Sequence, residues 1–111
     1  MAARYQLKRA RNGQHFFNLV ATNGEIILTS EMYSSMTGAK KGIASVQRNC
    51  KNPDRYDRRK GKRGKSHFVL KAANHRVIGC SEIYESQAAL EKGIKSVMKN
   101  GHTETIAAWD V

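Results

Sequence analysis

The sequence predicts a small α+β protein in which two tandem β-β-β-α repeats with pseudo-twofold symmetry share one antiparallel sheet and pack their helices on one face. Two observations predict this architecture. A shift of 51 positions aligns the chain with itself without a gap. Within each copy, apolar residues first alternate at period two, as in strands, and then change to the spacing of a helix. The 111 residues suffice for one core but not for two domains of ordinary size.

The internal repeat is clearest in two segments. Residues 30–35 (SEMYSS) align with residues 81–86 (SEIYES), and residues 41–46 (KGIASV) align with residues 92–97 (KGIKSV). A fixed period of this length is typical of a repeated supersecondary unit, and two copies indicate a pseudo-twofold domain rather than a solenoid. We therefore expect a single domain over residues 1–111, with the bounds of its parts at about 4–50 for repeat one, about 55–101 for repeat two and 102–111 for a C-terminal tail.

Three strands are predicted before the first helix. Asn12-Gly13 separates the segments 4–11 and 14–21, and this dipeptide tolerates the positive φ angles of a tight hairpin turn. Asn23-Gly24 then turns the chain into residues 25–30, a run rich in β-branched side chains. The second copy is expected to repeat this meander.

A helix follows in each copy. The apolar residues of the first helix are spaced three and four apart: Met36, Ala39, Ile43 and Val46. Ser35 and Ser86 are predicted N-caps, because a serine hydroxyl can accept a hydrogen bond from an unpaired N–H of the first turn. Asn49 and Asn100-Gly101 predict left-handed C-terminal stops.

Gly42 and Gly93 occupy matching positions in the middle of these helices. Glycine in a helix interior costs about 1 kcal/mol relative to alanine. The same cost at both positions predicts a close approach of each helix to the sheet or to the other helix.

Both copies contain a Ser-Glu-x-Tyr motif, which ends at Tyr33 and Tyr84. A hydroxyl, a carboxylate and a phenol could share a catalytic site, and a close approach of Glu31 and Glu82 would support one. The position of the motif between the third strand and the helix favours a structural role instead, in which the tyrosine anchors the helix. We therefore expect no enzymatic activity.

Three segments, 70–74 (LKAAN), 81–84 (SEIY) and 91–97 (EKGIKSV), together resemble the YegP-like family. The resemblance covers nearly the whole chain and leaves out only the extreme N-terminus and residues 102–111. It implies β-β-β-α units, in tandem or as single copies that pair, joined into one antiparallel sheet. It implies an unknown function and carries no catalytic residue over to this chain.

The two copies differ in their turns and first hairpins. His75 stands where the first copy has Gly24, so the second turn is expected to rely on Asn74 for a positive φ angle. Arg58 stands where the first copy has Leu7, which places a charge in the second copy's first strand.

Positive charge is the strongest anomaly of composition. The net charge is +11, the isoelectric point is near 10.1, and residues 51–76 alone carry +8. Polyanions are therefore the first partners to consider. The predicted polyanion-binding residues are the cations of the second copy's first hairpin: Arg58, Arg59, Lys60, Lys62, Arg63 and Lys65.

A β-ribbon of this kind can bind nucleic-acid phosphates through counterion release. Few aromatic residues lie near it, so binding would rely on the phosphate backbone rather than on base recognition. Two alternatives stay open. In the first, the charges serve only to keep an exposed edge hairpin soluble and unpaired. In the second, the chain is a protein-interaction or structural module.

Other classes of function find little support. No cofactor or metal site is predicted, because the four histidines lack ligand spacing: His15, His67, His75 and His102. Cys50 and Cys80 are expected to be reduced. Without an apolar stretch for a signal peptide or a membrane span, we expect a cytoplasmic protein, and the internal repeat favours a monomer.

Overall fold

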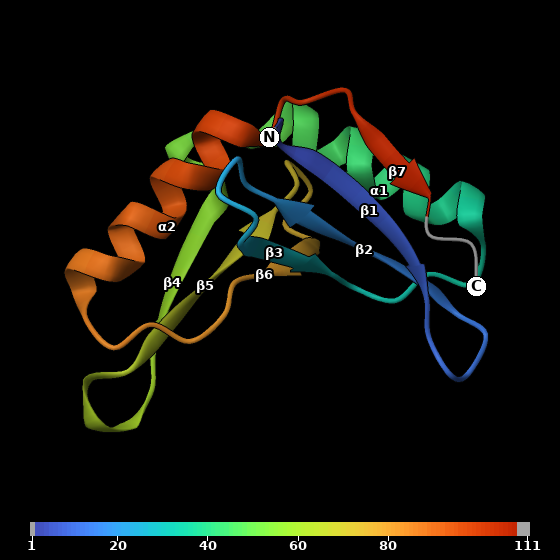
Figure 1. Ribbon diagram of the computed structural model, residues 1–111. Coiled ribbons are helices and arrows are strands. Elements are labelled where there is room, and N and C mark those ends of the chain that lie inside the picture. The colour runs from blue at the N-terminus through green and yellow to red at the C-terminus, as the bar shows by residue number, and fades with distance from the viewer. Residues whose placement is uncertain (1, 109–111) are drawn as a thin grey trace.

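The computed structural model describes residues 2–108, so Trp109, whose position the sequence does not predict, lies outside the described residues. Within this range the chain forms seven strands and two α-helices (Figure 1). Their bounds are β1 (Arg4–Arg9), β2 (His15–Val20), β3 (Ile26–Ser30), α1 (Met36–Asn49), β4 (Tyr56–Lys60), β5 (Ser66–Lys71), β6 (Val77–Cys80), α2 (Gln87–Asn100) and β7 (Ile106–Ala108).

All seven strands belong to one sheet, in the order β4-β5-β6-β3-β2-β1-β7. Neighbouring strands are antiparallel except at one edge, where β7 runs parallel to β1. The expectation of a purely antiparallel sheet is therefore wrong. The chain leaves α2 beside the start of β1, where the Tyr5 amide donates to the Thr105 carbonyl at 2.9 Å, and it then runs in the same direction as β1.

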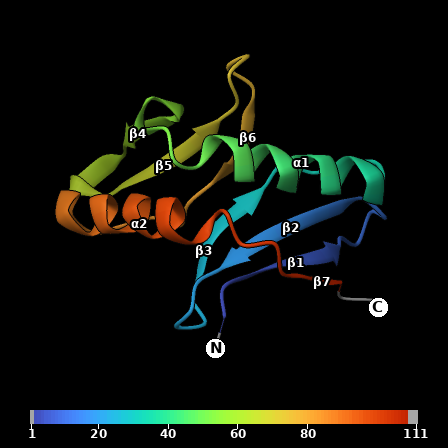
Figure 2. The same cartoon turned by 90° about the horizontal axis from the view of Figure 1, so that it is seen from above.

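Both helices lie on one face of the sheet, and their C-terminal ends approach each other near its middle (Figure 2). The first helix buries Ala39, Ile43 and Val46 of the predicted stripe, together with Gly42 and Asn49, whereas Met36 is exposed. Phe17 on β2 and Phe68 on β5 lie beneath the helices and are fully buried. Full burial of such a side chain contributes about 1.5 to 3 kcal/mol relative to exposure.

The predicted N-caps are confirmed. The hydroxyl of Ser35 accepts a hydrogen bond from the Gly38 amide at 3.0 Å, and that of Ser86 accepts one from the Ala89 amide at 3.1 Å. Each cap satisfies one amide that the helix itself leaves unpaired, which is typically worth about 1 kcal/mol.

The predicted left-handed stops are wrong. The residues that end the helices, Cys50 and Gly101, have right-handed φ angles of −63° and −65°. Their carbonyl groups are satisfied by tertiary contacts instead: the Tyr56 hydroxyl donates to the Cys50 carbonyl at 2.6 Å, and the Tyr5 hydroxyl donates to the Gly101 carbonyl. Glycine is required at position 101 for space, because a Cβ atom there would lie 2.8 Å from the Cys50 sulfur.

The two mid-helix glycines make room chiefly for a tyrosine, and Gly42 also makes room for Phe17 of β2, whose Cε2 would lie 3.0 Å from a Cβ atom there. A Cβ atom at Gly42 would lie 2.7 Å from Cζ of Tyr33, whose ring stacks on Phe17 with ring centroids 6.3 Å apart. The same arrangement recurs in the second half with Gly93, Tyr84 and Phe68. The predicted close approach to the sheet is thus made chiefly through the tyrosine that anchors each helix.

The turn between β5 and β6 differs from the expectation. His75 itself adopts the positive φ angle of 70°, at the position that matches Gly24 with φ 87°. Asn74 supports the turn in another way, because its side-chain oxygen accepts a hydrogen bond from the Arg76 amide at 3.0 Å. The prediction that Asn74 supplies the positive φ is therefore wrong.

Candidate polyanion-binding hairpin and polar groove

The predicted polyanion-binding residues all lie on the β4–β5 hairpin, whose tip projects from the body of the protein (Figure 1). β4 is the last strand at its edge of the sheet. The tip closes through a hydrogen bond of 2.7 Å from the Gly61 amide to the Lys65 carbonyl. Arg63 and Gly64 complete the turn with φ angles of 60° and 75°, and a positive φ is uncommon for a residue such as arginine.

Alternation along β4 divides the predicted residues between the two faces of the hairpin. Arg58 points towards α2, where its guanidinium binds both carboxylate oxygens of Glu91 at 2.6 and 2.9 Å. Arg59 points to the opposite face and pairs with Asp57 at 3.3 Å. The site is therefore a ribbon with cations on both faces rather than a single flat patch.

Ion pairs occupy three of the six predicted residues, since Lys65 also lies 3.7 Å from Glu85. The hydrogen bond from Arg58 lowers the pKa of Glu91 below its ordinary value. Hydrogen bonds from Lys71 and, to a lesser extent, Arg59 lower the pKa of Asp57 in the same way.

The remaining predicted residues are Lys60, Lys62 and Arg63. All of them are exposed, and none forms an ion pair within residues 2–108. They gather at the tip, so a polyanion can contact them without breaking an internal pair.

Two small pockets of about 210 and 320 Å³ flank this tip. Lys65 and Ser66 line both of them, Lys62 lines the smaller one and Lys60 the larger one. The tip therefore offers lysine side chains around two small concave surfaces.

The other basic hairpin, between β1 and β2, lies at the opposite end of the molecule (Figure 1). The strand order also places the two hairpins far apart, because four strands lie between β4 and β1 in the sheet. The cations of the two hairpins therefore do not form one continuous patch.

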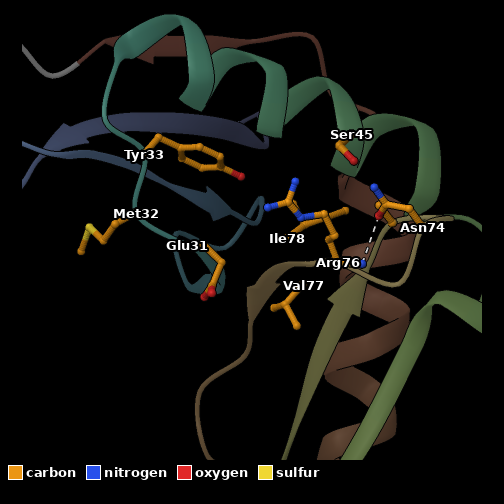
Figure 3. Close-up of a pocket in the computed structure, with 9 residues that line it drawn as sticks. Glu31, Met32, Tyr33, Ser45, Asn74, Arg76, Val77 and Ile78 are labelled. Carbon is orange, nitrogen blue, oxygen red and sulfur yellow. Dashed lines mark hydrogen bonds between the residues drawn. The ribbon is translucent and has the colours of Figure 1, made fainter.

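A larger concave surface, apart from the two pockets at the tip, is a groove of about 740 Å³ beside α1 (Figure 3). One wall comes from the segment between β3 and α1, another from α1 itself, and the third from the β5–β6 turn and β6. The groove is lined by Glu31, Met32, Tyr33, Ser45, Ala72, Asn74, Arg76, Val77 and Ile78.

Polar groups of the groove come from all three walls. The hydroxyl of Tyr33 reaches across to Gly42 of α1, and Ser45 lies three residues further along the same helix. Burial raises the pKa of the Tyr33 phenol, and the carboxylate of Glu31 adds to the rise, so the phenol keeps its proton at neutral pH. Such a site can hold polar or charged groups of a ligand in fixed positions.

Sequence reasoning singled out Glu31 and Tyr33 but missed Ser45, Asn74 and Arg76. The one available signal was the replacement of Glu25 by Arg76 at matching positions of the two copies.

The two glutamates of the Ser-Glu-x-Tyr motifs do not share this groove. The Glu31 amide donates to the Ile78 carbonyl at 3.0 Å, and the β3–β6 pairing places Ser30 opposite Gly79. In this register Glu82 lies beyond the opposite end of the pairing. The close approach that would support a catalytic pair is therefore absent from the described structure.

Residues 2–108 contain no cluster of three or more histidine, cysteine, aspartate or glutamate side chains that could bind a metal ion. Neither helix has the length and apolar character needed to cross a membrane. Both cysteines of the described chain are free thiols.

Comparison with known proteins shows the family. The model of a Domain of unknown function (DUF1508) matches residues 10–57 and, a second time, residues 62–107. The chain belongs to the DUF1508 family. The resemblance to YegP-like proteins is thereby confirmed, and this DUF1508 chain is 53% identical to the UPF0339 protein YegP of Yersinia pestis over 102 residues, which cover 92% of this chain and 91% of the relative.

Other relatives extend the DUF1508 match over nearly the whole chain. The UPF0339 protein YegP of Escherichia coli is 46% identical over 106 residues, which cover 96% of both chains. The solution NMR structure of a UPF0339 protein from Shewanella oneidensis has a TM-score of 0.91 at 50% identity and covers 97% of this chain and 92% of its own. The NMR structure of yegP from E. coli, a protein of unknown function, also has a TM-score of 0.91, at 45% identity, and covers 97% of this chain and 93% of its own.

Proposed function

We propose that this DUF1508 protein is a non-enzymatic binding module whose β4–β5 hairpin contacts nucleic acid or another polyanion. One observation carries the proposal. Lys60, Lys62 and Arg63 are exposed together at a projecting tip and have no ion-pair partner within residues 2–108. Together with a net charge of +11, this tip offers a site for phosphates that requires no internal rearrangement.

The expected mode of binding is independent of base sequence. Tyr5 and Tyr56, the tyrosines on the first strand of each basic hairpin, are buried, and their hydroxyls are bonded to carbonyl groups. They cannot stack on exposed bases, as sequence-tolerant single-strand binding normally requires. Contacts to the phosphate backbone remain, and these position a ligand without reading its bases.

The binding constant should depend steeply on salt. Each phosphate neutralised on duplex DNA changes the slope of log K against log salt concentration by about −0.9, so three tip cations give a slope of about −2.7. Arg58 should add little, because it would have to leave Glu91.

A titration of a fluorescently labelled DNA duplex with the protein, followed by anisotropy at two salt concentrations, tests this proposal. We expect binding at low salt that weakens as salt rises. No binding at low salt, or binding indifferent to salt, would refute it.

A protein-interaction or structural role is the second candidate, and the position of β4 favours it. β7 covers the outer edge of β1, whereas no strand of the described chain covers the outer edge of β4. An open edge can pair with a partner strand, although basic side chains also protect an edge from unwanted pairing. Recovery of a stoichiometric protein partner after nuclease treatment would favour this role.

The architecture proposed along with this function is that of two copies of one unit, related by a pseudo-twofold axis between β3 and β6. Support comes from the two successive matches to one family model and from the recurring Tyr-Gly-Phe contacts of α1 and α2. A protein that contains both units needs no second chain to complete its sheet, so we propose a monomer. We also propose a cytoplasmic location.

A further inference from the structure

The groove beside α1 contains three hydrogen-bond donors whose protons are free. The Arg76 guanidinium is exposed and has no ion-pair partner within residues 2–108. The Tyr33 hydroxyl makes no hydrogen bond with that part of the chain. The Ser45 hydroxyl accepts from the Asn49 side chain at 3.3 Å, which leaves its own proton available.

These donors face the same part of the groove. Because the Tyr33 hydroxyl lies against Gly42, it is one helical turn from Ser45 on the same side of α1. Figure 3 shows the Arg76 guanidinium directed towards them from the opposite wall. Three donors that converge from separate elements suit an oxyanion better than a neutral or cationic group.

The ring of one donor is held in place before any ligand binds, and the backbone that carries another is anchored. The ring of Tyr33 is fixed between α1 and Phe17, with ring planes inclined by only 12°. The backbone of Arg76 is fixed by the hydrogen bond from its amide to Asn74. Such preorganisation reduces the entropy lost on binding.

Glu31 restricts the ligand further. Its carboxylate lines the same groove and therefore disfavours a second negative charge nearby. A small ligand with one oxyanion group and a neighbouring amino or hydroxyl group fits these charges best.

The matching positions of the second half lack the cation. Tyr84 and Ser96 correspond to Tyr33 and Ser45, but Glu25 stands in place of Arg76. Burial raises the pKa of Tyr84, and the charges of Glu82 and Glu25 raise it further, which indicates that both carboxylates lie near its phenol. The chain thus contains its own control, a related surface with two carboxylates and no guanidinium.

We propose that the groove beside α1 binds the oxyanion group of a small carboxylate or phosphate compound, with Arg76, Tyr33 and Ser45 as donors, and that the matching surface of the second half does not. This site lies apart from the β4–β5 hairpin and does not depend on polyanion binding there.

An NMR titration of the ¹⁵N-labelled protein tests the site. Inorganic phosphate and acetate are added in separate arms, each against sodium chloride at equal ionic strength. Saturable shifts of the amides of Ser45, Asn74 and Arg76 in either arm, but not with chloride, are the expected result, and the arm that responds shows whether phosphate or carboxylate is preferred. Shifts that do not saturate, or that chloride reproduces, would overturn the proposal.

Two charge exchanges make the test specific. Arg76→Glu gives the groove the charges of its counterpart and should weaken binding at least tenfold. Glu25→Arg in that background should move the saturable shifts to the amides of Asn23 and Ser96.

Both changes are at exposed turn positions, and well-dispersed spectra confirm that each variant is folded. Unchanged affinity in Arg76→Glu would overturn the assignment, as would shifts confined to residues 60–65, which would assign the anion to the hairpin instead.

Discussion

The Tyr56 hydroxyl donates a hydrogen bond of 2.6 Å to the carbonyl oxygen of Cys50, so a strand of the second half caps the C-terminal end of the first half's helix. The reverse contact also exists, because Tyr5 of the first half donates to Gly101 at the end of α2. Burial raises the pKa of both phenols well above the ordinary tyrosine value, which keeps them protonated as donors. Each half thus provides a hydrogen-bond donor for the C-terminal end of the other half's helix.

The replacement Tyr56→Phe should lower the free energy of unfolding by about 1 to 2 kcal/mol, because it leaves the buried Cys50 carbonyl without its donor. Urea denaturation followed by circular dichroism measures this difference. Tyr33→Phe is the matched control, since its hydroxyl makes no hydrogen bond with residues 2–108, and it should have little effect. Equal effects of the two replacements would contradict the account.

Gly42→Ala should destabilise the protein by about 1 to 3 kcal/mol through overpacking, although alanine is the better helix former by about 1 kcal/mol. The added methyl group would lie 2.7 Å from Cζ of Tyr33. In a Tyr33→Ala background this contact is gone and only Cε2 of Phe17, 3.0 Å from the added methyl group, remains close, so the same glycine replacement should cost much less. A double-mutant cycle without this coupling would show that another contact requires the glycine.

The ion pair between Arg58 and Glu91 should make a small, pH-dependent contribution to stability. Because Arg58 lowers the pKa of Glu91 in the folded state, the contribution is present above the ordinary glutamate pKa and is lost as pH falls through the lowered value. The side chains are 41% and 38% exposed, so solvent screens the pair. The free energy of unfolding of Glu91→Gln and of the unchanged protein is measured from pH 7 down to acid pH. The difference between the two proteins should be present at pH 7 and disappear at low pH. A difference that grows as pH falls would contradict this prediction.

Alkylation should distinguish the two thiols. Cys50 is fully buried and burial raises its pKa, whereas Cys80 is partly exposed. Burial, and to a lesser extent the charge of Glu31, also raises the pKa of Cys80, so both react slowly. Mass spectrometry after iodoacetamide treatment should find Cys80 modified before Cys50 in the folded protein and both modified in urea. Modification of Cys50 first would contradict the packing of α1 against the second half.

Local patterns in the sequence predicted the helices, their serine caps and the turn at Gly13, because those features depend on neighbouring residues. The helix ends at Cys50 and Gly101 could not be predicted, since their partners Tyr56 and Tyr5 act across the fold. The parallel pairing of β7 with β1 could not be predicted either, because it depends on where α2 ends in the folded protein.

The candidate sites divide in the same way. The sequence located the basic hairpin, but it could not show that Arg58 is held by Glu91 of α2 while Lys60 at the tip stays unpaired within the described residues. The groove was missed because Tyr33, Ser45 and Arg76 are brought together only by the packing of α1 against the link after β3 and the β5–β6 turn.

The most direct test of polyanion binding compares two triple variants that each remove three positive charges. The hairpin variant is Lys60→Gln, Lys62→Gln and Arg63→Asn, with asparagine chosen because it tolerates the positive φ at position 63. The control variant, Lys40→Gln, Lys41→Gln and Arg48→Gln, changes exposed cations of α1.

The measured quantity is the slope of log K against log salt concentration for a DNA duplex. We expect the slope of the hairpin variant to be less steep by about 2.7 than that of the unchanged protein, and the slope of the control variant to be nearly the same as that of the unchanged protein. Equal losses in the two variants would show that net charge, and not this hairpin, determines binding.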